Sequence, residues 1–227
     1  MTLKVVGDLY EHRAFHRGCD GRESTVMESP PSRFPQPDDE FQLRITLLEV
    51  EPPVWRRVVV SQDVPLPRLH SIIQAALGWQ NAHLHQFRVG QLSFGEPTLE
   101  YGPGPIDHRQ ITLHQILPRA GATCIYEYDF GDGWEHEVQL EKELPADPAA
   151  GHTPRCTAGE RACPPEDCGG PHGYLALIAA IQNPGHPEHA EYRDWLGGAF
   201  DPEAFDLQAA NARLARLTGK TSRARRS

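Results

Sequence analysis

The feature that most constrains the fold of this chain is a strict alternation of apolar and polar side chains. Apolar residues stand at every second position of Phe41–Leu47, with polar residues between them. Because successive side chains of a strand point to opposite faces, this pattern predicts a strand with one buried face. Pro52 and Pro53 interrupt the run, since proline lacks the N–H that a sheet requires. The apolar stretch Val54–Val60 therefore predicts a returning strand and a hairpin.

After this hairpin the apolar residues change to a helical period. Leu69–Leu77 carries apolar side chains at helical spacing, Pro67 suits a first helical turn, and Gly78 is placed to end the helix. Further elements are predicted as a strand at His83–Val89, a hairpin of Cys124–Phe130 with Trp134–Leu144, and helices within Tyr174–Ile181, Pro187–Leu196 and Asp206–Leu217. The order hairpin, helix, strand, hairpin predicts an α+β fold: a β-grasp-like mixed sheet packed on a helix, with a Cys-rich loop and C-terminal helices.

The chain divides into three parts by composition. Residues 1–40 include a proline-rich polar stretch and predict a disordered N-terminal arm, with Cys19 as an unpaired thiol. Residues 41–217 predict a single α+β domain. The basic residues between Lys220 and Arg226 predict a disordered tail over 218–227.

Charge and hydropathy limit the functional classes. The formal net charge of −9 makes the body repel phosphate backbones, which argues against nucleic-acid binding through the acidic body. No apolar run approaches the roughly 18 residues that span a bilayer, and the N-terminus lacks a signal-peptide core. We therefore expect a cytoplasmic protein that does not contact the membrane and that binds an unknown protein partner.

Three of the five cysteines lie close together in sequence, at Cys156, Cys163 and Cys168. Thiolates are good zinc ligands, and four soft ligands complete a tetrahedral structural site. The surrounding proline and glycine residues suit a loop that folds back on one point, and a bound metal would supply order to it. The pattern therefore predicts a structural zinc ion. Reduced cysteines in a turn-rich loop are the alternative.

A closed site needs a fourth ligand, for which the chain offers several histidines. The candidates are His83, His85, His136 and His172. His136 shares a strand face with Trp134, so we expect it to point into the protein. Pairing of Phe130 with Trp134 would place Tyr128 opposite His136. A buried histidine with a hydrogen bond to such a tyrosine explains this position as well as a metal does.

Other polar residues bear on the same question. His83 and His85 are two residues apart on the predicted strand, a spacing that can hold a metal ion. The acidic stretch from Asp129 to Glu135 suits a metal ligand or a general base. Only its Asp132 lies in the predicted turn, where turn formation explains an aspartate as well. Glu166 and Asp167 are carboxylate alternatives for the fourth ligand.

Five stretches together resemble a known family. They are PPVWRRV (52–58), LHSIIQAALGWQNAHLHQF (69–87), YEYDFGDGWEHEV (126–138), CTAGERACPPEDCGGPHGY (156–174) and FDPEAFD (200–206). The chain resembles the root-inducing-plasmid open-reading-frame-three-like family, whose members are often named as insertion-sequence passenger proteins. The resemblance implies an α+β fold with a ubiquitin-like sheet. It also implies that the three cysteines and the histidines of HLHxF and GWxH recur while His172 varies, which favours His136 or His85 as the fourth ligand.

Two classes of function follow from these residues. The first is an uncharacterised, mobile-element-associated binding or adaptor module that a structural zinc ion stabilises. The alternative is a metal-dependent hydrolase with an open zinc site, in which Glu135, Asp129 or a histidine acts as base. A nucleic-acid-associated accessory protein is a second alternative. Four protein ligands would favour the adaptor, and three ligands plus water would favour the hydrolase, so the sequence leaves open whether the chain is an enzyme.

Overall fold

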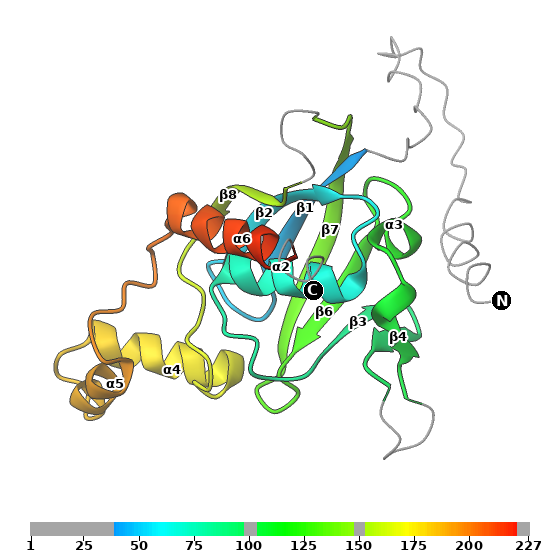
Figure 1. The fold of residues 1–227 in the computed structure, drawn as a ribbon. Coiled ribbons are helices and arrows are strands. Elements are labelled where there is room, and N and C mark those ends of the chain that lie inside the picture. The colour runs from blue at the N-terminus through cyan, green and yellow to red at the C-terminus, as the bar shows by residue number, and fades with distance from the viewer. Residues whose placement is uncertain (1–38, 98–103, 148–152, 222–227) are drawn as a thin grey trace, which may run out of the picture.

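A mostly antiparallel sheet forms the body of the protein (Figure 1). The computed structural model describes residues 39–97, 104–147 and 153–221. Within these ranges the strands are β1 (Glu40–Leu47), β2 (Trp55–Ser61), β3 (His85–Val89), β4 (Leu92–Gly95), β5 (Ile106–Asp107), β6 (Thr123–Tyr128), β7 (Trp134–Leu144) and β8 (Arg155–Glu160). The helices are α2 (Leu66–Leu77), α3 (Leu113–Ile116), α4 (Gly170–Gln182), α5 (His189–Leu196) and α6 (Leu207–Thr221), with a 3-10 turn η1 (His108–Gln110).

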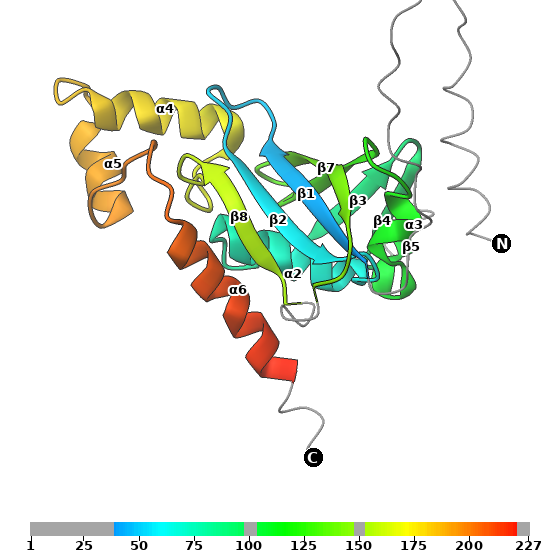
Figure 2. The same cartoon turned by 90° about the horizontal axis from the view of Figure 1, so that it is seen from above.

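The eight strands have the order β5-β4-β3-β6-β7-β1-β2-β8. Neighbouring strands are antiparallel except for β4 and β5, so the sheet is mixed as predicted. The α+β fold and the sheet packed on a helix are confirmed, because α2 lies across one face of the sheet (Figure 2). The β-grasp likeness is not confirmed by this strand order.

Strand β1 shows why the alternating pattern was informative. Its odd-numbered side chains are all buried, and they pack with Leu69 and Ile73 of α2 in one core. The opposite face of the sheet carries polar pairs, such as Arg57 with Glu141 at 2.6 Å between Nε and Oε2. Trp55 is buried on this opposite face, under the guanidinium groups of Arg44 and Arg57.

The hairpin of β6 and β7 differs from the prediction in its register. Tyr128 pairs with Trp134 and Tyr126 pairs with His136, whereas the sequence predicted Phe130 opposite Trp134. The turn is longer because Asp129 adopts a left-handed backbone conformation, with φ of 57°. The Asp129 carbonyl accepts the Gly133 N–H at 2.6 Å, which closes the turn.

The segment that carries the three cysteines was predicted as a loop, but part of it is a strand. Residues 155–160 form the edge strand β8, and Cys156 pairs with Val58 of β2. At the C-terminus, Asp206 caps α6 as predicted, because its Oδ1 accepts the Ala209 N–H at 2.9 Å. The α6 helix extends to Thr221, past the predicted domain boundary at 217. Cys19, the rest of the predicted arm up to residue 38, and tail residues 222–227 lie outside the described residues.

No helix in the described part of the chain combines the length and the apolar character needed to cross a membrane.

Candidate functional site

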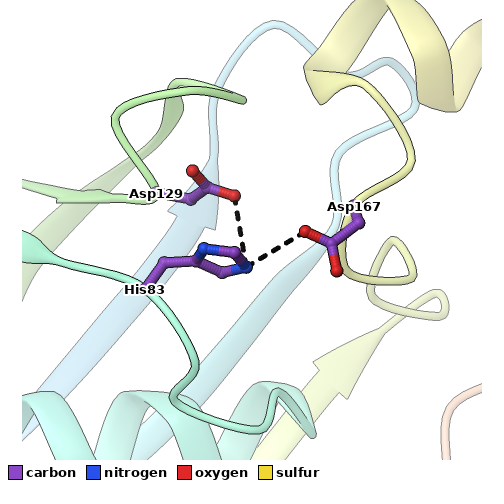
Figure 3. A group of neighbouring side chains, drawn as sticks. All are labelled: His83, Asp129 and Asp167. Carbon is purple, nitrogen blue, oxygen red and sulfur yellow. Dashed lines mark ion pairs between the residues drawn. The ribbon is translucent and has the colours of Figure 1, made fainter.

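Three side chains of types that can bind a metal ion come from separate segments and meet at one end of the sheet (Figure 3). The Nε2 atom of His83 lies 3.1 Å from Oδ1 of Asp167 and 3.5 Å from Oδ2 of Asp129. One ligand atom from each residue lies within 4.8 Å of the other two. His83 Nε2 is shielded from solvent and has no hydrogen-bond partner of suitable geometry among the described residues. The arrangement leaves the imidazole nitrogen facing two carboxylates.

The β6–β7 turn fixes the orientation of Asp129. Its Oδ1 accepts the N–H of Gly131 at 3.0 Å, so Oδ1 belongs to the turn and Oδ2 faces His83. The Asp129 N–H donates to the Leu84 carbonyl at 2.9 Å, which joins the turn to the segment that carries His83. Aspartate suits this position because its short polar side chain tolerates a left-handed backbone and can bond its own turn.

Asp167 comes from the segment that leads into α4. It also has a positive φ, of 59°, and its side chain is 71% exposed. The preceding Glu166 fastens this segment to the sheet, because its Oε1 accepts the Tyr128 hydroxyl at 2.9 Å and the Gln80 N–H at 2.8 Å. On the other side, the Gly169 N–H donates to Asp132 Oδ2 at 3.2 Å. The site therefore depends on contacts between the turn and the start of α4.

Gly170 permits this close contact, and its replacement is a direct test of it. A Cβ atom at Gly170 would lie 2.3 Å from the Asp132 carbonyl oxygen, and the residue has φ of +69°. Gly197 is a matched control, since its φ is +66° but a Cβ there would meet nothing within 4 Å. We expect Gly197→Ala to cost about 1–2 kcal/mol from the backbone alone. Gly170→Ala should cost clearly more in urea unfolding, and equal losses would contradict the close packing.

A layer of buried histidines and aromatic rings lies beneath the site. His70 and His85 stack with ring centroids 3.5 Å apart, and Tyr126 donates to or accepts from His70 Nδ1 at 2.7 Å. His136 is fully buried, with its Nδ1 3.4 Å from the Tyr126 carbonyl and its ring edge-on to Trp79. The Nε2 atoms of His85 and His136 have no hydrogen-bond partner among the described residues.

Burial dominates the titration of these histidines. It lowers the pKa of His70 and of His136 from 6.5 to about 4, and that of His85 to about 3. For His85, repulsion from His70 and His108 adds to the effect. These imidazoles are therefore neutral at pH 7, and a neutral imidazole is the form that binds a metal ion.

The three predicted cysteine ligands lie in one region but do not converge on a point. Burial raises the pKa of Cys163 and Cys168 to about 12 and also raises that of Cys156. The buried Arg56 guanidinium partly offsets this for Cys156 and Cys163. Among the described residues, the only group of three ligand atoms within 4.8 Å of one another is that of His83, Asp129 and Asp167. Cysteine-bound zinc with His136 or His85 stays a prediction.

The other histidine candidates occupy different places. His172 is exposed on α4. The family resemblance had already favoured His136 or His85 over His172 as the fourth ligand. His83 lies before β3 instead of within it, so it does not share a strand face with His85. The sequence had indicated His83, Asp129 and Asp167 separately, from their residue types. It gave no signal that the three meet, because each lies in a different loop.

A small cavity opens beside Asp167. It has a volume of about 240 Å³, and Glu188, Glu191, Tyr192 and Trp195 of the α5 region line it together with Asp167 and Cys168. The carboxylates and the half-exposed Trp195 ring make this cavity suited to a positively charged group. The cavity and the His83 cluster share Asp167.

Comparison with known proteins places the chain in a family. The plasmid pRiA4b ORF-3-like proteins match residues 39–209, which include every residue of the His83 cluster. The chain belongs to this family. It is 42% identical over 184 residues to the uncharacterized protein y4hQ of Sinorhizobium fredii, covering 80% of this chain and 94% of y4hQ. The family that the sequence resembled is thus confirmed.

A solved structure supports the fold of the family. The crystal structure of the protein of unknown function MM3350 from Methanosarcina mazei Go1 superposes with a TM-score of 0.68 at 32% sequence identity. The alignment covers 75% of this chain and 96% of MM3350. Both relatives of this plasmid ORF-3-like chain are described as having no known function.

Proposed function

We propose that this plasmid ORF-3-like protein binds a divalent cation through His83, Asp129 and Asp167 and acts as a metal-dependent hydrolase. The observation that carries the proposal is the His83 Nε2 atom, which is shielded from solvent, lacks a hydrogen bond and faces two carboxylate oxygens. A shielded imidazole nitrogen that faces two carboxylates without hydrogen-bond geometry is unfavourable in its neutral form, and a cation shared by the three groups would relieve it. Imidazole with carboxylates suits zinc or manganese.

Three protein ligands would leave coordination positions open, which is the property of catalytic and not of structural sites. A divalent cation with an open position polarises a carbonyl group and activates water. The residues of the chain would hold the cation and orient it. Asp129 Oδ2 and His83 come from the ends of the inner strands β6 and β3, and Asp167 sits on the more exposed side. The exposed side faces the cavity lined by the α5 residues.

The cavity favours a peptide-like substrate over a nucleotide. Glu188, Glu191 and Asp167 line it, and these carboxylates would repel a phosphate group. The carboxylates would instead attract an amino or guanidinium group, and the face of the Trp195 ring would bind that cation through a cation–π interaction. We therefore propose an amide substrate with a positively charged side chain or terminus.

A second candidate function is the zinc-stabilised adaptor module. The observation that favours it is that Cys156 and Cys163 lie near Arg56, and Cys168 lies near Cys163. Rotation of the three thiols toward one point, with His136 or His85, would create a closed site with no catalytic position. The two proposals differ in which side chains hold the metal.

Metal affinity of single variants tests both proposals. Zinc is titrated calorimetrically into metal-free protein, and then manganese is titrated in the same way. Asp129→Asn and Asp167→Asn should each lower the affinity by at least ten- to a hundredfold, the range found for removal of groups that merely support a ligand. The exposed Asp194→Asn on α5 is the control and should leave the affinity unchanged. Unchanged affinity in both cluster variants, with loss in Cys163→Ser, would replace the first proposal by the second.

Activity is measured separately from binding. A lysyl amide with a fluorescent leaving group is incubated with zinc-loaded protein, and the glutamyl amide serves as the charge-reversed substrate. We expect cleavage of the lysyl amide alone, and its loss in Asp129→Asn. Metal binding at the cluster without cleavage of either amide would retain the cation site and reject the hydrolase.

A further inference from the structure

We propose that the groove between α2 and α6 is a binding site for a small phosphorylated molecule. A cavity of about 560 Å³ lies there, and Arg68 of α2 lines it with Arg213 and Arg216 of α6. Figures 1 and 2 both show α6 running beside α2. The proposal is independent of the cation site, because no residue of the His83 cluster lines this cavity.

The charge of the cavity contrasts with that of the protein. Of the described residues, three arginines line the cavity and no aspartate or glutamate does, although the whole chain has a formal net charge of −9. Arg68 is partly buried, and its side chain forms no ion pair or hydrogen bond with another described residue. Burial lowers the pKa of Arg68, and no carboxylate of a described residue opposes the change. A partly buried guanidinium without an internal ion pair is stabilised when an anion from outside the chain binds to it.

Unlike Arg68, Arg213 is held in place by hydrogen bonds within the protein. Its Nε donates to the Ala75 carbonyl at 2.7 Å and its Nη2 to the Ala76 carbonyl at 3.4 Å. These carbonyls belong to the last turn of α2, where a cation is favourable. The two bonds fix the guanidinium at the wall of the cavity. Because a guanidinium has five N–H donors, others remain for a ligand.

The remaining lining groups and the size indicate the class of ligand. Ser71, Gln80 and Asn81 line the cavity with a hydroxyl and two amides, and the exposed Gln80 side chain and the Asn81 amide nitrogen can reach a ligand. Gln74 also lines the cavity, but its side chain is buried and bonded to Tyr126 and to the Asn81 N–H. Arginine recognises phosphate through paired N–H···O bonds. A volume of about 560 Å³ falls within the range of small-molecule sites, roughly 300–1,000 Å³, and exceeds the needs of a bare phosphate. A nucleotide-sized phosphate ester fits these features.

A nucleic acid fits them less well. The three arginines form a confined patch, and a polyanion that extends beyond it would meet the acidic body of the protein. The occupant we infer is therefore a free phosphorylated compound.

Calorimetric titration of the full-length protein in chelator tests the proposal without any metal. ADP is the probe, adenosine is the uncharged comparison, and a 20-nucleotide single-stranded DNA represents the other class of ligand. We expect ADP to bind, adenosine to bind at least about tenfold more weakly because charged hydrogen bonds are lost, and DNA to bind no better than ADP. Equal binding of ADP and adenosine, or tighter binding of DNA, would overturn the proposal, as would no binding of ADP.

Two variants test the residues of the site. Arg68→Gln and Arg216→Gln should each weaken ADP binding about tenfold or more. Neither side chain forms a described internal bond, so both variants should unfold at the wild-type urea concentration. The exposed Arg193→Gln on α5, outside the cavity, is the matched control and should bind ADP normally. Wild-type affinity in both cavity variants, or an equal loss in the control, contradicts the site.

Discussion

Trp134→Ala is expected to lower the free energy of unfolding by about 3–5 kcal/mol. Trp134 begins β7 and is 1% exposed. Its ring centroid lies 5.8 Å from that of Trp79, and its backbone pairs with Tyr128. Truncation would open a cavity among these large rings, and a core of this density closes such a cavity only partly. Urea unfolding followed by circular dichroism measures the loss.

Trp195→Ala on α5 is the matched control, because the same side chain there is 49% exposed. It should change the free energy of unfolding by no more than about 0.5 kcal/mol. A loss below about 1 kcal/mol for Trp134→Ala would mean that the indole does not pack in the core. Since Trp134 directly follows the turn that holds Asp129, the same variant should also weaken zinc binding.

Several strands and the helix α2 were predictable because the residue patterns that specify them lie within short stretches of sequence. The alternation in β1 follows from one buried face, and the prediction that Trp134 and His136 point inward follows from the same period of two. The helix α2 was predictable from its apolar spacing and from Gly78, which ends it with φ of +102°. Each of these signals lies within a dozen residues.

The remaining features depend on long-range contacts. Strand β8 has only six residues and owes its conformation to pairing with β2, which lies about a hundred residues earlier. The register of β6 and β7 depends on the left-handed backbone of Asp129, which residue type alone does not determine. The His83 cluster needs that turn, the segment before β3 and the segment before α4 to meet. No local pattern contains this information.

The second large effect is a loss of stability at mildly acid pH. His70, His85 and His136 have pKa values of about 4, 3 and 4 in the folded protein, lowered mainly by burial from 6.5. Between these values and 6.5 the unfolded chain binds more protons than the folded one, so stability rises with pH in this window. It is fully present above pH 6.5 and is lost progressively below it. One such group contributes a loss of about 2 kcal/mol between pH 6.5 and pH 5.

His136→Phe separates this effect from other acid-sensitive interactions. His136 is fully buried, its Nε2 has no hydrogen bond among the described residues, and its ring packs edge-on against Trp79. A phenyl ring keeps the shape and cannot bind a proton. In chelator, the difference in unfolding free energy between pH 7 and pH 5 should therefore shrink by about 2 kcal/mol in this variant. Parallel pH curves for wild type and His136→Phe would show that the buried imidazole accepts a proton without cost.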